Sequence, residues 1–326
     1  MVTVVDSIIQ NQLFERQTKL KHAIADIGEN PELKRLLHEV DTALARVKTG
    51  DFGLCEICKG EIEPERLMAN PLTKFCLDDL TITQQRELQR DLEMASLVQK
   101  SLLPKENLNL NGWSFSYKYQ PLSLVSGDYC DLISIDNKDF YFILGDVSGK
   151  GVAASMLMTQ LHAMFRSFIS LNLPLVQMVE RVSSIFCEST MPMHFATLVC
   201  GKVSNTSEVE ICNAGHLPPL LIQSDKLIDI QATGLPVGMF CDEEFSSTKF
   251  QLNPNDTLLL FTDGLTEAEN NFGDDFGKDR LTNLLFNHSL ESLDKIINFI
   301  IKDLNSFQAG KPLTDDLTLM LLRRTY

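Results

Sequence analysis

The sequence lacks any uninterrupted apolar run of the roughly 18 residues that a membrane span needs. Its first residues, "MVTVVDSIIQNQ", reach Asp6 before a secretory hydrophobic region develops. Apolar residues as such are not scarce, because 44% of the 326 positions are hydrophobic, enough for one large core and a smaller accessory domain. A disordered chain is therefore excluded, and we expect a soluble cytoplasmic protein without membrane contact.

Basic residues are fewer than acidic ones. The chain has 29 Lys and Arg against 44 Asp and Glu, a net charge of −15, of which −4 falls on residues 1–103 and −11 on residues 104–326. An acidic field of this size does not attract nucleic acid or anionic lipid. If the substrate is anionic, positive charge must come from elsewhere, and divalent cations are the natural source.

Cysteines number eight, and their spacing indicates no disulfide framework, because five are isolated: Cys130, Cys187, Cys200, Cys212 and Cys241. The other three share the stretch "CEICKGEIEPERLMANPLTKFCLDD". Cys55 and Cys58 form a C-x2-C pair, Cys76 follows after 17 intervening residues, and Asp79 stands where a second pair would end. Three thiolates and a carboxylate can hold zinc in a tetrahedron, with lower affinity than four thiolates. The alternative is a finger that has lost its metal and survives on packing.

Two helices are predicted within residues 6–49, where apolar residues recur near a 3.6-residue period. "GENPE" breaks the pattern at residues 28–32, with Pro31 in the first turn of the second helix and Asn30 as its cap. The short break favours an antiparallel hairpin, serving either as a structural or dimerising element or as a binding element.

A third helix is predicted at residues 81–103, which contain neither Gly nor Pro. A coiled-coil seam with one polar position follows a spacing of fours and threes through Leu88, Leu92, Ala95, Gln99 and Leu102. We expect a linker that pairs with a second copy to form a homodimer. The competing interpretation is a helix that packs on its own downstream domain.

The words "ALARVKTGDFGLCEICKGEIEPERLMANPLTKFC" resemble the DksA/TraR zinc-finger family over roughly residues 40–80, apart from the missing fourth cysteine. Members of that family pair a helical hairpin with this finger and act on RNA polymerase through the hairpin tip, which here lies around Glu29. The resemblance implies RNA polymerase as a partner. The arms are only about 20 residues, near 30 Å, so the reach of the hairpin is in question.

From Trp113 onward, short strands with turn signals are interrupted by helical stretches near residues 151–170 and 174–190, and the last strand is "LTLMLLRR". The mixture predicts an α+β or sandwich-like catalytic domain. Several buried strands begin or end at aspartate: Asp263 in "LLLFTDGLTEAE", Asp146 in "DFYFILGDVSGKG", Asp128 in "LVSGDYCD", and Asp315 and Asp316 in "LTDDLTLML".

One Asp-Gly after a strand is ordinarily a turn, but four such places in one domain indicate a site. Strands that share a core bring their ends together, and unpaired carboxylates there would raise one another's pKa. Mg²⁺ or Mn²⁺ would resolve that conflict, and the nearby glycines would let the main-chain carbonyl of Val147 join the ligands. Two such cations can activate a water for in-line attack on phosphorus.

The ordered words "EMASLVQKSLLP", "SGDYCD", "GDVSGKGVAASMLM", "FATLVCGKV", "NAGHLPPLL", "GLPVGMF", "LLLFTDGLTEAEN" and "DDLTLMLL" resemble the SpoIIE/RsbU branch of the PPM (protein phosphatase 2C-like) family. The resemblance runs from about residue 92 to 325. It implies an αββα sandwich, two Mn²⁺ or Mg²⁺ ions, and hydrolysis of a phosphoserine or phosphothreonine protein by a metal-activated water. It also implies a STAS-type anti-sigma-factor antagonist as substrate.

Carried over position by position, the resemblance makes Asp146 the ligand shared by both metals, beside the Val147 carbonyl. Asp263 and Asp315 become further ligands, and Asp128 binds directly or through water. Asp315 is favoured over Asp316, whose alternative role is a strand cap. Roles of lower weight, support or surface, fall on Asp131 and Glu267. His216 in "NAGH" is either a general acid or, as we favour, held by hydrogen bonds, and the other two domain histidines considered, His162 and His194, are expected to be structural.

The chain is thus expected to divide into a hairpin with a zinc-finger-like module (1–80), a coiled-coil linker helix (81–103) and a phosphatase domain (104–326). The function predicted is a metal-dependent protein serine/threonine phosphatase regulated through its N-terminal module. One rival is a transcription-regulating, RNA polymerase-binding protein whose phosphatase fold is an inactive scaffold. A metal nuclease using the same carboxylates is a third, which the acidic field opposes.

Overall fold

The computed structural model describes residues 4–27, 31–79, 82–104, 109–110, 112–135, 139–191, 194–204, 207–223 and 226–325. The chain forms two compact units, Met1–Asp91 and Leu92–Tyr326. The predicted hairpin cap Asn30 and tip residue Glu29 lie outside the described residues. Among the helices described, none combines the length and hydropathy that a bilayer crossing requires.

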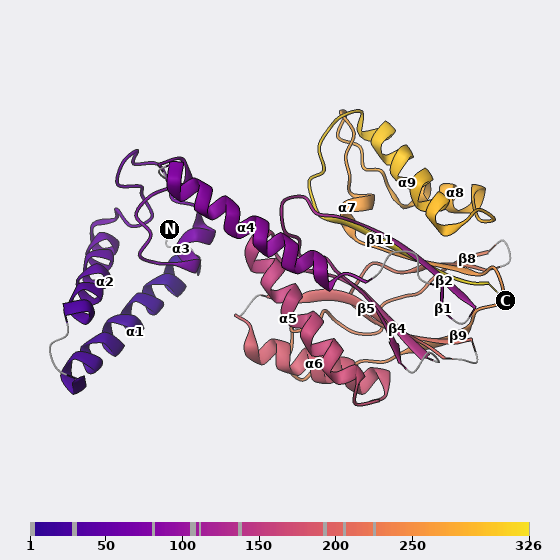
Figure 1. Cartoon of the computed structure of the whole chain (residues 1–326), viewed down its shortest axis with the longest axis horizontal. Coiled ribbons are helices and arrows are strands. Elements are labelled where there is room, and N and C mark those ends of the chain that lie inside the picture. Colours follow the sequence, from indigo (N-terminus) through magenta and orange to yellow (C-terminus); the bar gives the residue numbers. More distant parts are fainter. Residues whose placement is uncertain are drawn as a thin grey trace. The chain divides into compact units, whose positions relative to one another are not determined.

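The first unit is a pair of helices that carries a small finger (Figure 1). Helix α1 (Val4–Ile27) and helix α2 (Pro31–Thr49) confirm the two predicted helices, and α3 (Pro64–Ala69) and a 3-10 turn (Leu77–Asp79) complete the unit. Its core joins both helices to the finger through the buried residues Ile9, Leu13, Val40, Ala43, Leu44, Cys55, Ile62, Leu67 and Cys76. Two of the four predicted zinc ligands are therefore also core residues.

The second unit holds two antiparallel sheets. The first has the order β1-β2-β11-β10-β7-β8 and the second the order β3-β4-β5-β6-β9. Strands of the first sheet are β1 (Asn109–Leu110), β2 (Trp113–Gln120), β7 (Leu220–Gln223), β8 (Lys226–Asp229), β10 (Thr257–Phe261) and β11 (Leu317–Arg324). Strands of the second are β3 (Tyr129–Ile135), β4 (Asp139–Val147), β5 (Ala196–Val203), β6 (Glu208–Ala214) and β9 (Thr248–Gln251).

Helices cover the outer face of each sheet. Helices α5 (Gly151–Ile169) and α6 (Leu175–Ser189) lie on one side, and α8 (Lys278–Asn287) and α9 (Leu293–Gln308) on the other (Figure 1). Three cores separate the four layers, one between the sheets and one under each helix pair. This is the αββα sandwich that the family resemblance implied. Helices α8 and α9 had not been recognised from the sequence pattern.

Helix α4 (Ile82–Leu102) confirms the predicted linker as a helix, but its predicted seam is not uniform. Leu88 is exposed, whereas Gln99 is only 4% exposed and hydrogen-bonds Ser126. The C-terminal half of α4 therefore packs on its own downstream domain, as the competing interpretation held. The boundary between the two units falls within this helix.

The cysteine spacing indicated no disulfide framework, but two of the isolated cysteines do pair. Cys187 near the end of α6 and Cys241 in the loop between β8 and β9 form a disulfide. The two cysteines are 54 residues apart and neither belongs to a recognisable spacing pattern, so their pairing could not be predicted from the sequence. Two main-chain amides of the same loop also donate to α6 side chains, Gly238 to Ser183 and Phe245 to Glu180.

Candidate metal centres

Three of the predicted carboxylate ligands lie at the ends of neighbouring strands. Asp146 is the penultimate residue of β4, Asp263 opens the one-turn helix α7 (Asp263–Thr266) directly after β10, and Asp315 comes just before β11. Strands β10 and β11 are antiparallel with Phe261 opposite Leu319, which places the end of one beside the start of the other. Both sheets thus contribute carboxylates to one edge of the sandwich.

These carboxylates are close enough to raise one another's pKa. Burial, followed by the charges of Asp263, Asp315 and Asp316, raises the pKa of Asp146 from 3.8 to about 7. Burial and then the charge of Asp315 also raise the pKa of Asp263. Carboxylates that repel one another in this way are stabilised by a bound divalent cation, and carboxylate oxygens are ligands that Mg²⁺ and Mn²⁺ prefer.

Glycine at position 127 leaves room next to the predicted shared ligand. A Cβ there would lie 3.2 Å from the Val147 carbonyl oxygen and 3.4 Å from Asp146 Oδ1. A side chain at 127 would therefore crowd the two oxygens that are predicted to ligate metal. Open space beside both oxygens is what a cation site requires, so the residues present fit the implied metals.

The aspartates nevertheless do not surround a single point. In the described part of the chain, the cysteine cluster is the one group of three or more Cys, His, Asp or Glu whose ligand atoms all lie within 4.8 Å of one another. The strand-end carboxylates are spread more widely, so one cation cannot contact three of these side chains as they stand. A spread set of carboxylates suits a pair of cations better than one.

Asp128 occupies a different environment from the other three. It is 1% exposed, and Thr262 Oγ1 and Thr318 Oγ1 both donate to its Oδ2. Burial, and next the charge of Asp146, raises the pKa of Asp128 well above its usual range. Asp128 is thus buried and links Thr262, which follows β10, to Thr318 of β11, and a role as a direct metal ligand stays a prediction.

Asp316 holds a loop in place. Its Oδ1 accepts a hydrogen bond from the Leu122 amide at 2.7 Å and its Oδ2 accepts one from the Gly127 amide at 2.9 Å. The same loop is fixed from the other side by Gln99. Asp315 is also engaged, by the Asp316 amide at Oδ1 and by Lys150 at Oδ2, but its side chain is 38% exposed, whereas Asp316 is buried with both oxygens held by main-chain amides. The preference for Asp315 over Asp316 as the ligand stays a prediction.

His216 is enclosed within the protein. Its Nδ1 lies 2.9 Å from Thr197 Oγ1 and its Nε2 lies 3.1 Å from the Phe261 carbonyl oxygen, so it joins β5 of one sheet to β10 of the other. Burial lowers the pKa of His216 to about 4, which keeps the ring neutral. A neutral imidazole whose two nitrogens are both hydrogen-bonded to protein is poorly suited to protonate a leaving group, and this supports the structural interpretation.

Two residues of lower weight lie where their expected roles place them. Asp131 is fully buried and forms a two-pronged ion pair with Arg166 of α5. Glu267 is exposed at the end of α7. His162 lies 3.6 Å from Asp131 and is part of the same buried polar group, in line with a structural role.

Lys150, Gln99, Thr262 and Thr318 were missed as site residues. Lys150 Nζ lies 2.7 Å from Asp315 Oδ2. Lys150 lies in "GDVSGKG", four residues after Asp146, but lysine does not ligate metal ions, so the pattern of ligands did not include it. The contacts of Gln99 and the threonines join residues 27 to 190 positions apart, and no local pattern signals them.

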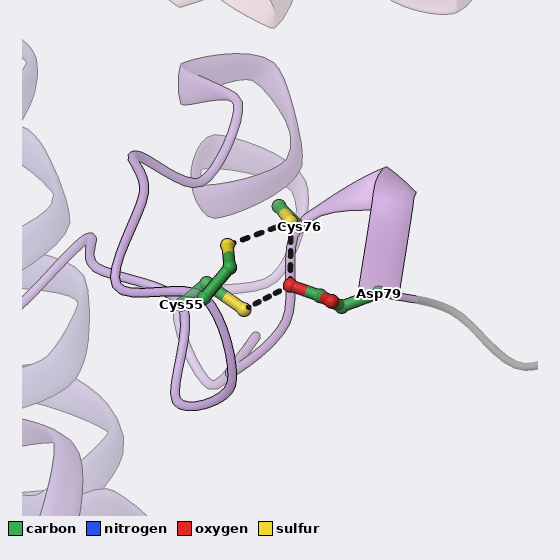
Figure 2. Close-up of side chains that lie close together, drawn as sticks. Cys55, Cys76 and Asp79 are labelled. Carbon is green, nitrogen blue, oxygen red and sulfur yellow. Dashed lines mark hydrogen bonds between the residues drawn. The ribbon is translucent and has the colours of Figure 1, made fainter.

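The finger forms a second candidate centre (Figure 2). Asp79 Oδ2 lies 3.0 Å from Cys55 Sγ and 3.2 Å from Cys76 Sγ, and Cys58 Sγ lies 3.6 Å from Cys76 Sγ. In a zinc tetrahedron with Zn–S bonds of about 2.3 Å, neighbouring sulfurs are about 3.8 Å apart. The four predicted ligands thus already have the spacing of one closed zinc site.

The thiols influence one another's titration. Hydrogen bonding to Asp79, followed by burial, raises the pKa of Cys76 to about 12, and hydrogen bonds from the three cysteines lower the pKa of Asp79. Zinc binds thiolates, so the ion would have to replace the protons that these thiols hold. The site therefore fits zinc. Its affinity should be lower than that of a site with four thiolates, because one ligand is a carboxylate.

Two known families match parts of this chain. Residues 136–325 match the family described as stage II sporulation protein E (SpoIIE), and residues 50–78 match the prokaryotic DksA/TraR C4-type zinc finger. The chain is 31% identical to phosphoserine phosphatase RsbP of Bacillus subtilis, over 55% of this chain and 46% of RsbP. It is 26% identical to phosphoserine phosphatase RsbU of the same organism, over 74% of this chain and 72% of RsbU.

A solved structure has the same fold. The SiaA-PP2C domain of Pseudomonas aeruginosa superposes with a TM-score of 0.65 at 18% identity, covering 74% of this chain and 98% of that domain. The similarity confirms the PP2C-like sandwich. The chain spans less than half the length of RsbP, so the match concerns the domain and not the whole relative.

Proposed function

Because the chain belongs to the SpoIIE family, we propose that it is a metal-dependent protein serine/threonine phosphatase regulated through its N-terminal finger module. The observation that carries the proposal is the meeting of Asp146, Asp263 and Asp315, from strands of both sheets, at one edge of the sandwich. Two relatives are named phosphoserine phosphatases, which supports the reaction class.

The chain's own residues hold and space the reacting groups. Asp146, Asp263 and Asp315, with the Val147 carbonyl, would hold two Mn²⁺ or Mg²⁺ ions. When bound, such ions activate a water and neutralise the charge of the phosphoryl group. Asp128 fixes the β10 and β11 ends through Thr262 and Thr318, and Asp316 fixes the loop that carries Gly127.

A phosphoserine or phosphothreonine protein is the substrate that this site suits, and a STAS-type anti-sigma-factor antagonist is the specific substrate we propose. The site is open to solvent at Lys150 and Asp315, whose side chains are 57% and 38% exposed. An exposed site can accept a phosphorylated residue on the surface of a folded protein. We further propose a cytoplasmic homodimer that pairs through the exposed N-terminal half of α4, and zinc bound by Cys55, Cys58, Cys76 and Asp79.

The test is hydrolysis of an aryl phosphate and of a phosphoserine protein, each measured with Mn²⁺, Mg²⁺ or EDTA. Wild type is compared with Asp146→Asn and Asp263→Asn, which remove a ligand charge with little change of shape. Asp279→Asn in the first turn of α8 is the matched control, because it removes the same charge from an exposed position.

We expect activity that requires a divalent cation, falls at least about 100-fold in both ligand variants, and is unchanged in the control. Activity that survives EDTA, or an Asp146→Asn enzyme as fast as wild type, would overturn the proposal. Mn²⁺ and Mg²⁺ are distinguished by the same measurement.

A second candidate function rests on the finger, which matches the DksA/TraR family over residues 50–78. In this alternative the chain binds RNA polymerase and regulates transcription, and the phosphatase fold is an inactive scaffold. Capture of RNA polymerase by the full chain, lost on substitution of Glu29 and accompanied by no metal-dependent hydrolysis, would favour it. Capture together with hydrolysis would mean that the finger localises an active phosphatase.

A further inference from the structure

Lys150 is a cation placed where a cation is least expected. It precedes the first residue of α5, and the N-terminus of a helix carries partial positive charge that favours anions. Its side chain makes no hydrogen bond that caps the helix. A lysine at this position is therefore repelled by the helix N-terminus, and an interaction with an anionic group would offset that repulsion.

The compensating partner is Asp315. Lys150 Nζ lies 2.7 Å from Asp315 Oδ2 and also donates to the Thr314 carbonyl oxygen at 2.9 Å. Among the described residues, Lys150 is the one basic side chain in ion-pair contact with a predicted metal ligand. Asp315 Oδ1 already accepts a hydrogen bond from the Asp316 amide at 2.9 Å, so the ammonium and a divalent cation would compete for Oδ2.

The backbone around Lys150 leaves it free to move. Gly149 and Gly151 have φ of +97° and +73°, and the space where a Cβ would stand on each is open. No heavy atom lies within 4 Å of either Cβ position, and the lysine side chain is itself 57% exposed. The ammonium can therefore leave Asp315 without disturbing the core.

We propose that Lys150 is a tethered competitor of the divalent cation at Asp315: its ammonium holds the carboxylate until a metal displaces it. The inference rests on the proposed function, since it takes Asp315 as a metal ligand, and it adds a residue that sets the cation concentration at which the enzyme becomes loaded. The released ammonium then stands at the rim of the site, with a positive charge facing the anionic substrate.

The test measures Mn²⁺ binding directly, from the electron paramagnetic resonance signal of free Mn²⁺ titrated into the full chain. Lys150→Met removes the charge and keeps the length of the side chain, and Lys150→Arg keeps the charge. Lys295→Met is the matched control, because Lys295 is an exposed lysine of α9 paired with Glu291 and lies outside the site. Asp315→Asn is combined with Lys150→Met to show whether the effect runs through that carboxylate.

Removal of an exposed ion pair worth about 0.4–1 kcal/mol corresponds to a roughly two- to fivefold change in affinity. We expect Lys150→Met to lower the Kd for Mn²⁺ by this factor, Lys150→Arg and Lys295→Met to bind as wild type does, and Lys150→Met to have no effect in the Asp315→Asn background. Half-maximal hydrolysis by Lys150→Met should occur at correspondingly less Mn²⁺.

Unchanged or weaker Mn²⁺ binding by Lys150→Met would overturn the inference and leave the phosphatase proposal standing. An effect of equal size in the Asp315→Asn background would overturn it too, because the lysine would then act through the general field. A wild-type chain that binds no Mn²⁺ would overturn the proposed function, and this inference with it.

Discussion

Gln99 of α4 and Ser126 exchange two hydrogen bonds: the Gln99 side-chain amide donates to the Ser126 carbonyl at 2.7 Å, and the Ser126 amide donates to Gln99 Oε1 at 3.0 Å. Gln99 replaces a strand partner for one residue of the loop that leads to Gly127 and Asp128. Ser126 is fully buried, so its main-chain amide and carbonyl depend on the Gln99 side chain for hydrogen bonds.

Gln99→Ala should therefore destabilise the second unit by about 1–3 kcal/mol, because two buried main-chain groups lose their partner. It should also weaken Mn²⁺ binding, because the same loop positions Gly127 beside the predicted ligand Asp146. Urea unfolding and Mn²⁺ titration check the two effects. Lys100→Ala, at the adjacent exposed position, should change neither. Equal stability of the two variants would contradict the prediction.

Metal-free protein should become less stable as the pH rises. The pKa of Asp146 is raised from 3.8 to about 7 in the folded chain, so the folded state binds this proton more tightly than the unfolded state. The stability that protonation supplies is present at low pH and is lost as the pH passes from about 4 to about 7.

In EDTA, the free energy of unfolding attributable to this group should fall by about 1–2 kcal/mol between pH 5.5 and 7.5. Asp146→Asn should flatten that slope and should exceed wild type in stability at pH 7.5. Asp279→Asn should keep the wild-type slope. Addition of Mn²⁺ to the wild-type protein at pH 7.5 should raise its free energy of unfolding again. Denaturant titrations at the two pH values test this; a wild-type stability that increases toward pH 7.5 in EDTA would refute it.

The Cys187–Cys241 disulfide should stabilise the second unit. A cross-link between residues 54 apart removes entropy from the unfolded chain worth roughly 4 kcal/mol in the chain-entropy model. Reductant should lower the urea midpoint of wild type, and the Cys187→Ser/Cys241→Ser double variant should match reduced wild type. The double variant itself should not respond to reductant, and an equal response would show that reduction acts elsewhere.

Zinc retention should depend on the fourth ligand. Asp79→Cys replaces a carboxylate with a thiolate, which suits zinc better, and should slow zinc loss to a chromogenic chelator. Cys76→Ser should release zinc and unfold the first unit, because Cys76 also lies in its core. Asp78→Cys, one residue away and exposed, is the control that adds a thiol without a ligand position. Identical release from Asp79→Cys and wild type would mean that Asp79 does not bind the ion.

Local pattern was sufficient to place the elements that carry their own periodicity or end on a polar residue. The helices at Gly151–Ile169 and Leu175–Ser189 and the final strand at Leu317–Arg324 were predicted within a residue or two. Asp146 and Asp263 were recognisable because each interrupts a run of buried residues with a charge. The αββα arrangement itself came from the family resemblance, and the solved relative confirms it.

Contacts between distant residues could not be predicted in the same way. Thr262 and Thr318 look like ordinary strand residues until folding brings both hydroxyls to Asp128. Cys187 and Cys241 pair only because a loop returns to α6. Gln99 occupied a seam position that suited a second helix equally well, and its choice of Ser126 depends on a loop whose course the sequence does not encode locally.

Glycine at position 264 brings two turns into direct contact. A Cβ on Gly264 would lie 2.0 Å from the Asp316 carbonyl oxygen, so the main chains of the Asp263 and Asp315 turns touch with no side chain between them. The separation of these two predicted ligands is therefore limited by direct contact between main chains, without an intervening side chain. Any side chain larger than hydrogen at position 264 would push the two turns apart and so change the spacing of the carboxylates.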